Sequence, residues 1–155
     1  MPPLQISTFT VAAAITLTTI AFAQEKRIQR ADLPSAVEKT VLAQSQGATI
    51  KGFSQETEKG QVYYEAELTL NGHSKDVLID AKGAIVELEE QVPFDTLPSA
   101  VKDGLNAKAG AGKILKVESL TKHDNLVAFE AVVQTGGKKR EIQVGPDGKP
   151  LAHEE

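Results

Sequence analysis

The pentapeptide LPSAV occurs twice in this chain, at residues 33–37 and again at residues 97–101. A shift of about 64 residues aligns the two copies, and a shift of about 65 aligns everything from Lys51 onward. Under the second shift apolar residues meet apolar residues, with Val62, Tyr64, Ala66 and Leu68 opposite Val127, Phe129, Ala131 and Val133. Turn glycines coincide as well, Gly83 with Gly148. This ordered series of matches predicts an internal duplication.

Each copy is predicted to begin with a helix. Pro34 and Pro98 suit the first position of a helix, where a missing N–H leaves no hydrogen bond unmade. Apolar residues then recur at helical spacing, as Leu33, Val37 and Val41 in the first copy and as Leu97, Val101 and Leu105 in the second. Each helix therefore has one apolar stripe that must pack against another element.

The residues after each helix show the alternation of β-strands. In QVYYEAELTLNG, residues 61–72, every second side chain is apolar, and Asn71-Gly72 is typical of a hairpin turn. Further strands are predicted through KDVLID (75–80) and REIQV (140–144). Fourth strands are expected at about residues 84–89 and near Leu151.

The predicted fold class is therefore α+β, with two tandem repeats, each of one helix packed on a four-stranded antiparallel sheet. The repeats are expected at residues 31–91 and 92–155. Buried positions should be Val37, Val41, Tyr64, Leu68, Val77 and Ile79, and their counterparts Val101, Leu105, Phe129, Val133, Ile142 and Val144. Tyr64 and Phe129 test the register, because a slip of one residue would turn every strand side chain to the other face.

The first residues have the pattern of an export signal. They contain no charged side chain, carry an apolar and Thr-rich stretch from Phe9 to Ile20, and end in Ala21-Phe22-Ala23, a small-x-small cleavage pattern. A buried helix or a membrane anchor are the alternatives, although the stretch is short for a membrane span. We expect residues 1–23 to be a signal peptide, the mature protein to be periplasmic or secreted, and no stable membrane anchor to remain after cleavage.

Composition and residue types exclude several classes of function. The chain of 155 residues has a net charge of −4, which argues against nucleic acid as a partner. The absence of cysteine excludes disulfides and thiol chemistry, and His73, His123 and His153 lie too far apart in sequence to indicate a metal site. Neither a nucleophile elbow nor a phosphate-binding loop is present. We expect a protein that is not an enzyme, with no catalytic residues, no metal and no cofactor.

Three motifs carry a resemblance to a known family. They are the leading LP-x-x-V of each helix, the aromatic-Glu-Ala step at residues 64–66 and 129–131, and the ID-x-x-G turn at residues 79–83. Together they resemble the PepSY-like, β-lactamase-inhibitor-like family of exported bacterial proteins. The resemblance implies helices packed on antiparallel sheets in tandem. It also implies that a sheet surface can be presented to a secreted enzyme, as in the inhibitors that give the family its name.

The solvent face of the predicted sheet is the candidate binding surface. The residues assigned to it are Tyr63, Glu65, Glu67, Leu78 and Glu130. Leu78 is apolar at an outward position, and interface centres combine such residues with a polar rim. The expected function is recognition of an unknown protein or peptide in the cell envelope, with possible inhibition of an exported enzyme. The alternatives are a merely solvated, charged face and a cation or small-ligand site formed by Glu65, Glu67 and Glu130.

Overall fold

The structure is a computed structural model that describes residues 25–155. The expected signal peptide, residues 1–23, lies outside the described residues. The first half comprises β1 (Lys26–Ile28), the 3-10 helix η1 (Arg30–Asp32), α1 (Ser35–Gln44), β2 (Thr49–Glu58), β3 (Gln61–Leu70) and β4 (His73–Asp80). The second comprises β5 (Ile85–Gln91), the 3-10 helix η2 (Phe94–Thr96), α2 (Ser99–Ala109), β6 (Lys113–Lys122), β7 (Asn125–Thr135) and β8 (Lys138–Val144).

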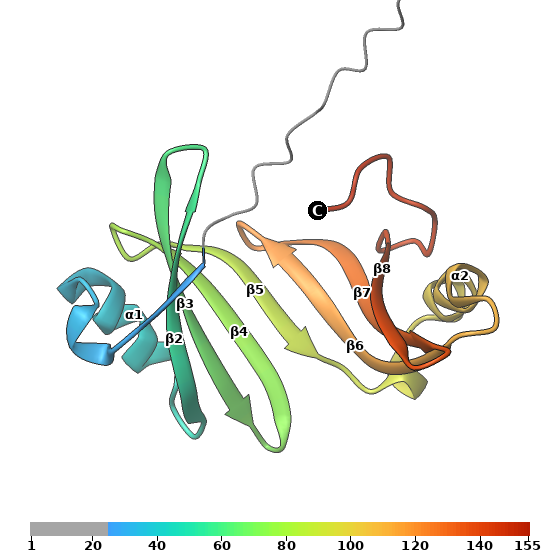
Figure 1. The fold of residues 1–155 in the computed structure, drawn as a ribbon, viewed down its shortest axis with the longest axis horizontal. Helices are drawn as coiled ribbons and strands as arrows, with labels where there is room; N and C mark the ends of the chain where they lie inside the picture. Colours follow the sequence, from blue (N-terminus) through green and yellow to red (C-terminus); the bar gives the residue numbers. More distant parts are fainter. Residues whose placement is uncertain (1–24) are drawn as a thin grey trace, which may run out of the picture.

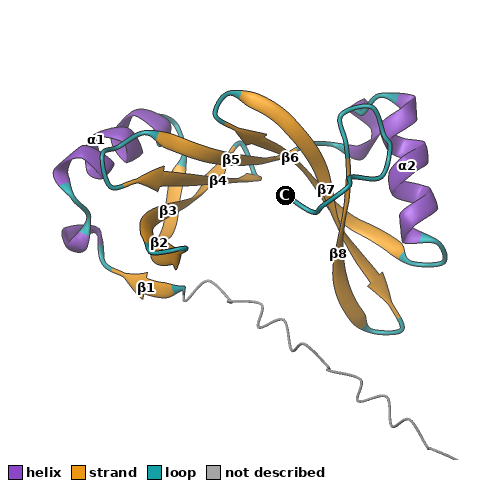
Figure 2. Cartoon of the chain, turned by 90° about the horizontal axis from the view of Figure 1, so that it is seen from above, coloured by secondary structure: helices purple, strands orange, loops and turns teal. Residues whose placement is uncertain are grey.

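The eight strands found in residues 25–155 form one antiparallel sheet in the order of the chain, β1 to β8. Figure 1 shows α1 and α2 at opposite ends of this sheet. Both helices begin within one residue of the predicted start, because α1 and α2 begin at Ser35 and Ser99, directly after Pro34 and Pro98. In the view of Figure 2 the sheet is curved and strongly twisted between the helices.

The prediction of two separate four-stranded sheets is wrong. β5, expected to end the first unit, also pairs with β6 from Glu87↔Lys122 to Gln91↔Glu118, so the hydrogen-bonded ladder runs on without a break. If β5 were an exposed edge, a row of its backbone N–H and C=O groups would be unpaired. Pairing with β6 gives these groups hydrogen-bond partners. No strand forms near Leu151, and the chain turns back at Gly145, whose N–H donates to the carbonyl of Lys149. β1 was not predicted, since three residues are too few to show alternation.

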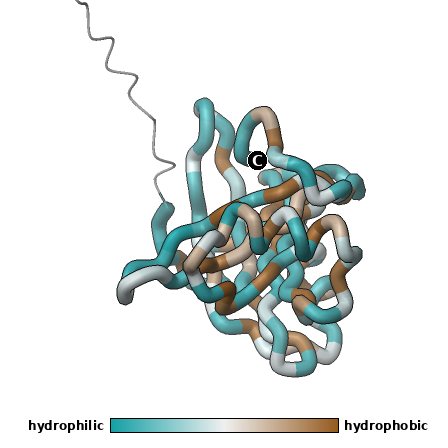
Figure 3. Tube along the Cα trace, turned by 90° about the vertical axis from the view of Figure 1, so that its right-hand side faces the viewer, coloured by the Kyte–Doolittle hydropathy of each residue, from teal (hydrophilic) through white to brown (hydrophobic). Residues whose placement is uncertain are grey.

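Two apolar clusters lie between the sheet and the helices. α1 buries Val37 and Val41 in the first cluster, and α2 buries Val101 and Leu105 in the second. Hydrophobic and hydrophilic residues alternate along the strands that cover them (Figure 3). Of the twelve positions predicted to be buried, only Tyr64 is not fully so, and it packs against the first cluster as a half-buried side chain. Phe129 is 7% exposed, so the predicted assignment of strand faces is confirmed.

The turn after β4 fixes α1 on the sheet. Thr40 Oγ1 of α1 donates a hydrogen bond of 2.6 Å to the carbonyl oxygen of Gly83. Gly83 has φ +89°, and a Cβ placed there would lie 2.6 Å from the carbonyl oxygen of Ala36. Gly148, after β8, has φ +79°, and a Cβ placed there would lie even closer to the carbonyl oxygen of Ala100 in α2. A glycine is therefore required where each turn touches its helix.

We predict that Gly83→Ala lowers the free energy of unfolding by about 2 kcal/mol or more, because the methyl group adds a steric clash to an unfavourable positive φ. Gly72→Ala is the matched control, since Gly72 has φ +85° but open space around its Cβ position. It should cost only the backbone penalty of about 1 kcal/mol. Urea unfolding of both variants measures the difference, and equal losses would contradict the close approach of turn and helix.

Candidate binding face

The side of the sheet opposite the helices is strongly acidic. Strand alternation and pairing direct nine carboxylates to it from β2 to β8: Glu56, Glu65, Glu67, Asp76, Glu87, Glu89, Glu118, Glu130 and Glu141. We call this surface the acidic face. Three basic side chains, Arg27, Lys116 and Lys122, form ion pairs with carboxylates of this face. Within the described part of the chain, carboxylates therefore greatly outnumber basic groups here.

The acidic face contains a hollow of about 460 Å³. Seven carboxylates line it together with Leu78: Glu25, Glu56, Glu65, Asp76, Glu87, Glu89 and Glu141. These side chains come from β2 to β5, from β8 and from the residue before β1, so the curved sheet brings distant strands to one site. The volume is in the range of small-ligand sites, but the lining is far more charged than is usual for them.

Three carboxylates stand directly opposite one another on neighbouring strands. Glu67 on β3 pairs in register with Asp76 on β4, and Asp76 pairs with Glu89 on β5. Like charges in such positions destabilise a sheet. Burial, with repulsion from Glu130 and Glu118 among other carboxylates, raises the pKa of Glu89 to about 8. Burial and the neighbouring carboxylates Glu65 and Glu118 raise the pKa of Asp76 to about 6. Near neutral pH Glu89, at the centre of the face, therefore retains its proton, whereas Asp76 is mostly ionised.

Hydrogen bonds fix several of the other carboxylates. Glu118 is 4% exposed and accepts a 2.8 Å hydrogen bond from Ser74 Oγ. It also forms an ion pair with Lys116 at 2.7 Å. Ser54 Oγ donates to Glu65 at 2.7 Å, and Gln143 Nε2 donates to Glu130 at 2.8 Å. Burial nevertheless raises the pKa of both Glu65 and Glu130, against the effect of these hydrogen bonds. The carboxylates are thus held in place rather than free to move apart.

The structure places all five predicted surface residues on the acidic face. Glu65 and Leu78 line the hollow, whereas Glu67 lies beside it and pairs with Arg27. Tyr63 pairs in register with Asp80 near the edge of the face, and Glu130 lies on β7. All five are half-buried, not fully exposed.

Sequence reasoning missed several carboxylates of the face: Glu56, Asp76, Glu87, Glu89, Glu118 and Glu141. For Asp76 a signal was present, because it has the same strand parity as Leu78. Glu87 and Glu89 alternate with apolar residues in IVELEEQ in the same way. Their convergence with Glu118 depends on the pairing of β5 with β6, which the sequence pattern does not encode.

Among the residues that the structure describes, two groups of carboxylates are close enough to hold a cation. The first is Glu25, Glu65 and Glu67, and the second is Asp76, Glu89 and Glu118; within each group one oxygen per residue lies within 4.8 Å of the others. Oxygen ligands of this kind suit Ca²⁺. The cation site predicted from the sequence, formed by Glu65, Glu67 and Glu130, is not brought together, because Glu130 belongs to neither group.

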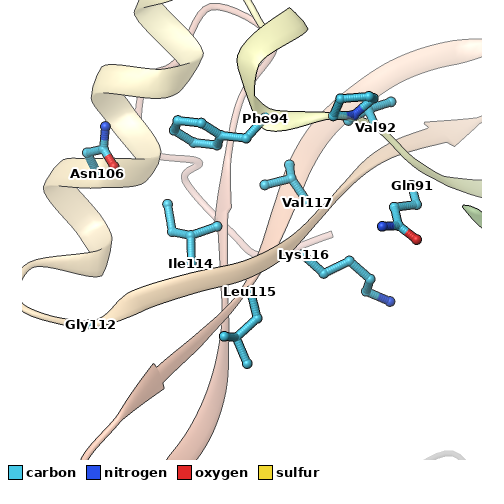
Figure 4. Close-up of a pocket in the computed structure, with 10 residues that line it drawn as sticks. Gln91, Val92, Phe94, Asn106, Gly112, Ile114, Leu115, Lys116 and Val117 are labelled. Atoms are coloured by element: carbon cyan, nitrogen blue, oxygen red, sulfur yellow. The ribbon is translucent and has the colours of Figure 1, made fainter.

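A second hollow, of about 380 Å³, lies on the helix side. Figure 4 shows Phe94, Ile114 and Val117 around it, with Asn106 of α2 at one side. Leu115, where β6 carries a bulge, is 41% exposed beside this hollow. Six of the ten residues that line this hollow are apolar, and it lacks the converging charges of the acidic face.

Comparison with known proteins shows the fold but not a family. No family model matches the chain, and no curated protein matches it. Among solved structures, a BLIP-like protein from Bacteroides fragilis is 24% identical, with a TM-score of 0.56 over 77% of this chain and 83% of that one. A protein from Bacteroides eggerthii, inferred to be periplasmic, is 20% identical with a TM-score of 0.62 over 77% and 86% of the two chains. A DUF2874 family protein from Bacteroides ovatus is also 20% identical, with a TM-score of 0.59 over 77% and 84%.

The fold is thus of the BLIP-like type. This confirms the β-lactamase-inhibitor-like part of the resemblance at the level of fold, while the PepSY part and the tandem repeats are not confirmed. None of these three neighbours is described as an enzyme. The description of the Bacteroides eggerthii protein agrees with the predicted periplasmic or secreted location. Within residues 25–155, no helix has the length and apolar character needed to cross a membrane.

We predict that Glu89→Gln makes the protein more stable at alkaline pH. Because the pKa of Glu89 is raised from 4.5 to about 8 on folding, its contribution to stability is fully present below pH 4.5 and is lost as the pH rises through 8. The variant should gain about 2 kcal/mol over the wild type at pH 9, allowing for screening by solvent, and almost nothing at pH 4. Denaturant unfolding at both pH values measures this. The control is Glu90→Gln, on the opposite side of β5 beside Lys75. An equal gain in the free energy of unfolding at pH 9 in both variants would contradict the prediction.

Proposed function

We propose that this protein is an exported, non-enzymatic binding module that binds a basic segment of another protein or peptide through its acidic face. The observation that carries the proposal is the hollow lined by seven carboxylates and Leu78. Burial of these carboxylates and repulsion among them cost stability, as the raised pKa values of Glu89 and Asp76 indicate. A cationic partner would relieve that cost, because opposite charges placed among the carboxylates favour their ionised form.

The chemistry of the lining supports recognition rather than catalysis. The hollow offers carboxylates for lysine and arginine side chains and one apolar side chain, Leu78, for the aliphatic part of such residues. The hydrogen bonds from Ser54 and Gln143 hold Glu65 and Glu130 in position before binding, which lowers the entropic cost of association. Inhibition of an exported enzyme is one consequence that binding could have, and the name of the BLIP-like neighbour points in that direction.

Calorimetric titration with a hexalysine peptide tests the proposal. The wild type should bind the peptide more weakly as salt rises, because the interaction is mainly electrostatic. The triple variant Glu65→Gln, Glu87→Gln, Glu89→Gln should lose about tenfold or more in affinity. The control is Glu38→Gln with Asp103→Asn, which removes carboxylates from α1 and α2 on the other side of the sheet. Equal affinities of the triple variant and the wild type would refute the acidic face as the binding surface.

A second candidate function is binding of a divalent cation, and the group of Asp76, Glu89 and Glu118 is the observation that favours it. Three carboxylates from three neighbouring strands converge there, and Glu118 is held by Ser74 and Lys116. The ion pair with Lys116 counts against a tight site, since one positive charge already lies beside the group.

Titration with CaCl₂ separates the two candidates. A cation site predicts a saturable isotherm for the wild type that is lost in Asp76→Asn, with affinity in the range of about 10⁻⁴ to 10⁻³ M typical of extracellular sites. Glu141→Gln, at the rim of the hollow and outside both groups, should leave the isotherm unchanged. If titration with CaCl₂ gives no saturable heat, the cation site is rejected and the basic segment of a partner is the remaining candidate ligand.

A further inference from the structure

Basic side chains of the protein itself already pair with carboxylates of the acidic face, and Arg27 is one of them. Arg27 projects from β1, and its guanidinium forms an ion pair with Glu67 of β3. To reach Glu67 it passes over β2, because Arg27 pairs in register with Ser54, and Gly52 is the residue of β2 opposite Glu67. The chain's own arginine therefore occupies part of the surface at which the proposed basic partner would bind.

Gly52 provides the space for this contact. A Cβ at Gly52 would lie 2.5 Å from Arg27 Nη1 and 3.6 Å from a carboxylate oxygen of Glu67. Gly52 is not among the glycines with positive φ, so its backbone does not require glycine. The Arg27 guanidinium fills the space that a side chain at position 52 would need, which explains the glycine there.

Arg27 is held more loosely than the other two basic groups that form ion pairs on the face. The Arg27 side chain is 64% exposed, compared with 34% for Lys116 and 30% for Lys122. Lys116 also pairs with the buried Glu118, whereas Glu67 remains 27% exposed. β1 has only three residues, and only these three pair with β2. Exposed ion pairs on short edge elements contribute little to stability, so this contact is readily exchanged.

We propose that Arg27 is an internal competitor for the acidic face, and that a basic side chain of the partner must displace it from Glu67 in order to bind. This inference rests on the proposed function. It adds an autoinhibitory contact that limits affinity at the end of the face formed by β2 and β3. Within that region a partner guanidinium would pair with Glu67 from the solvent side, where the Glu67 side chain is 27% exposed, and would not need the space above Gly52.

Two variants test the competition with a hexaarginine peptide in calorimetric titration. Arg27→Gln removes the competitor and should strengthen binding about two- to fivefold, the range expected for release of an exposed ion pair. Gly52→Ala keeps the positive charge but removes the space for the guanidinium, so it should also strengthen binding. Because Gly52→Ala leaves the net charge unchanged, a gain in this variant cannot come from a weaker overall repulsion of the peptide.

Two controls separate displacement from general charge effects. Lys122→Gln removes one positive charge from the same face, where Lys122 pairs with Glu87 and Glu155, and should change affinity less than Arg27→Gln does. Arg30→Gln breaks the ion pair of Arg30 with Glu38 of α1 and should have no effect. A gain in both Arg27→Gln and Gly52→Ala supports the competition.

Equal gains in Arg27→Gln and Lys122→Gln with none in Gly52→Ala would overturn the inference while leaving the proposed function intact. The proposed function itself fails if the wild type and Arg27→Gln both show no binding of either peptide at low salt. Urea unfolding of each variant confirms that the sheet is retained.

Discussion

The pairing of β5 with β6 is the interaction on which the rest of the structure depends. Five residue pairs, from Glu87↔Lys122 to Gln91↔Glu118, join the strands that cover one apolar cluster to those that cover the other. Without this pairing each half would have an open edge, and Glu89 and Glu118 would lie on separate surfaces. With it, the carboxylates of seven strands form one continuous face. The site therefore arises from the junction of the two halves as much as from either half.

The two sides of the sheet have opposite effects on the stability of the fold. On the helix side, the burial of valine, leucine and isoleucine stabilises the fold, and glycines at positions 83 and 148 let the turns approach the helices closely. On the acidic face, Glu67, Asp76 and Glu89 stand opposite one another at a cost to stability. Proteins retain such costs mainly where function requires them. The molecule thus has one side that stabilises the fold and an opposite side, the proposed binding face, that costs stability.

Alternation in single strands could be read from the sequence with good accuracy. It placed Leu68, Val77 and Phe129 inside, and Glu65 and Glu67 on the outer face, because a period of two is a local property of the chain. The order and extent of the sheet could not be read in this way. β5 has the same alternation whether it ends a sheet or joins two halves, and β1 is too short to show any pattern. The contact between Arg27 and Glu67 was beyond sequence reasoning for the same reason, since it depends on an unpredicted strand and on a glycine whose role appears only in three dimensions.

The order of the strands has a consequence for the way the chain folds. Every strand pairs only with its neighbours in sequence, and the connections between paired strands are short turns except for the two that contain α1 and α2. Such a topology has a low contact order for a protein that is mostly β-sheet, and low contact order favours fast folding. Each hairpin can add to the growing edge as the chain emerges, in the direction from β1 to β8. This topology favours formation of the sheet one hairpin at a time, and no disulfide has to form.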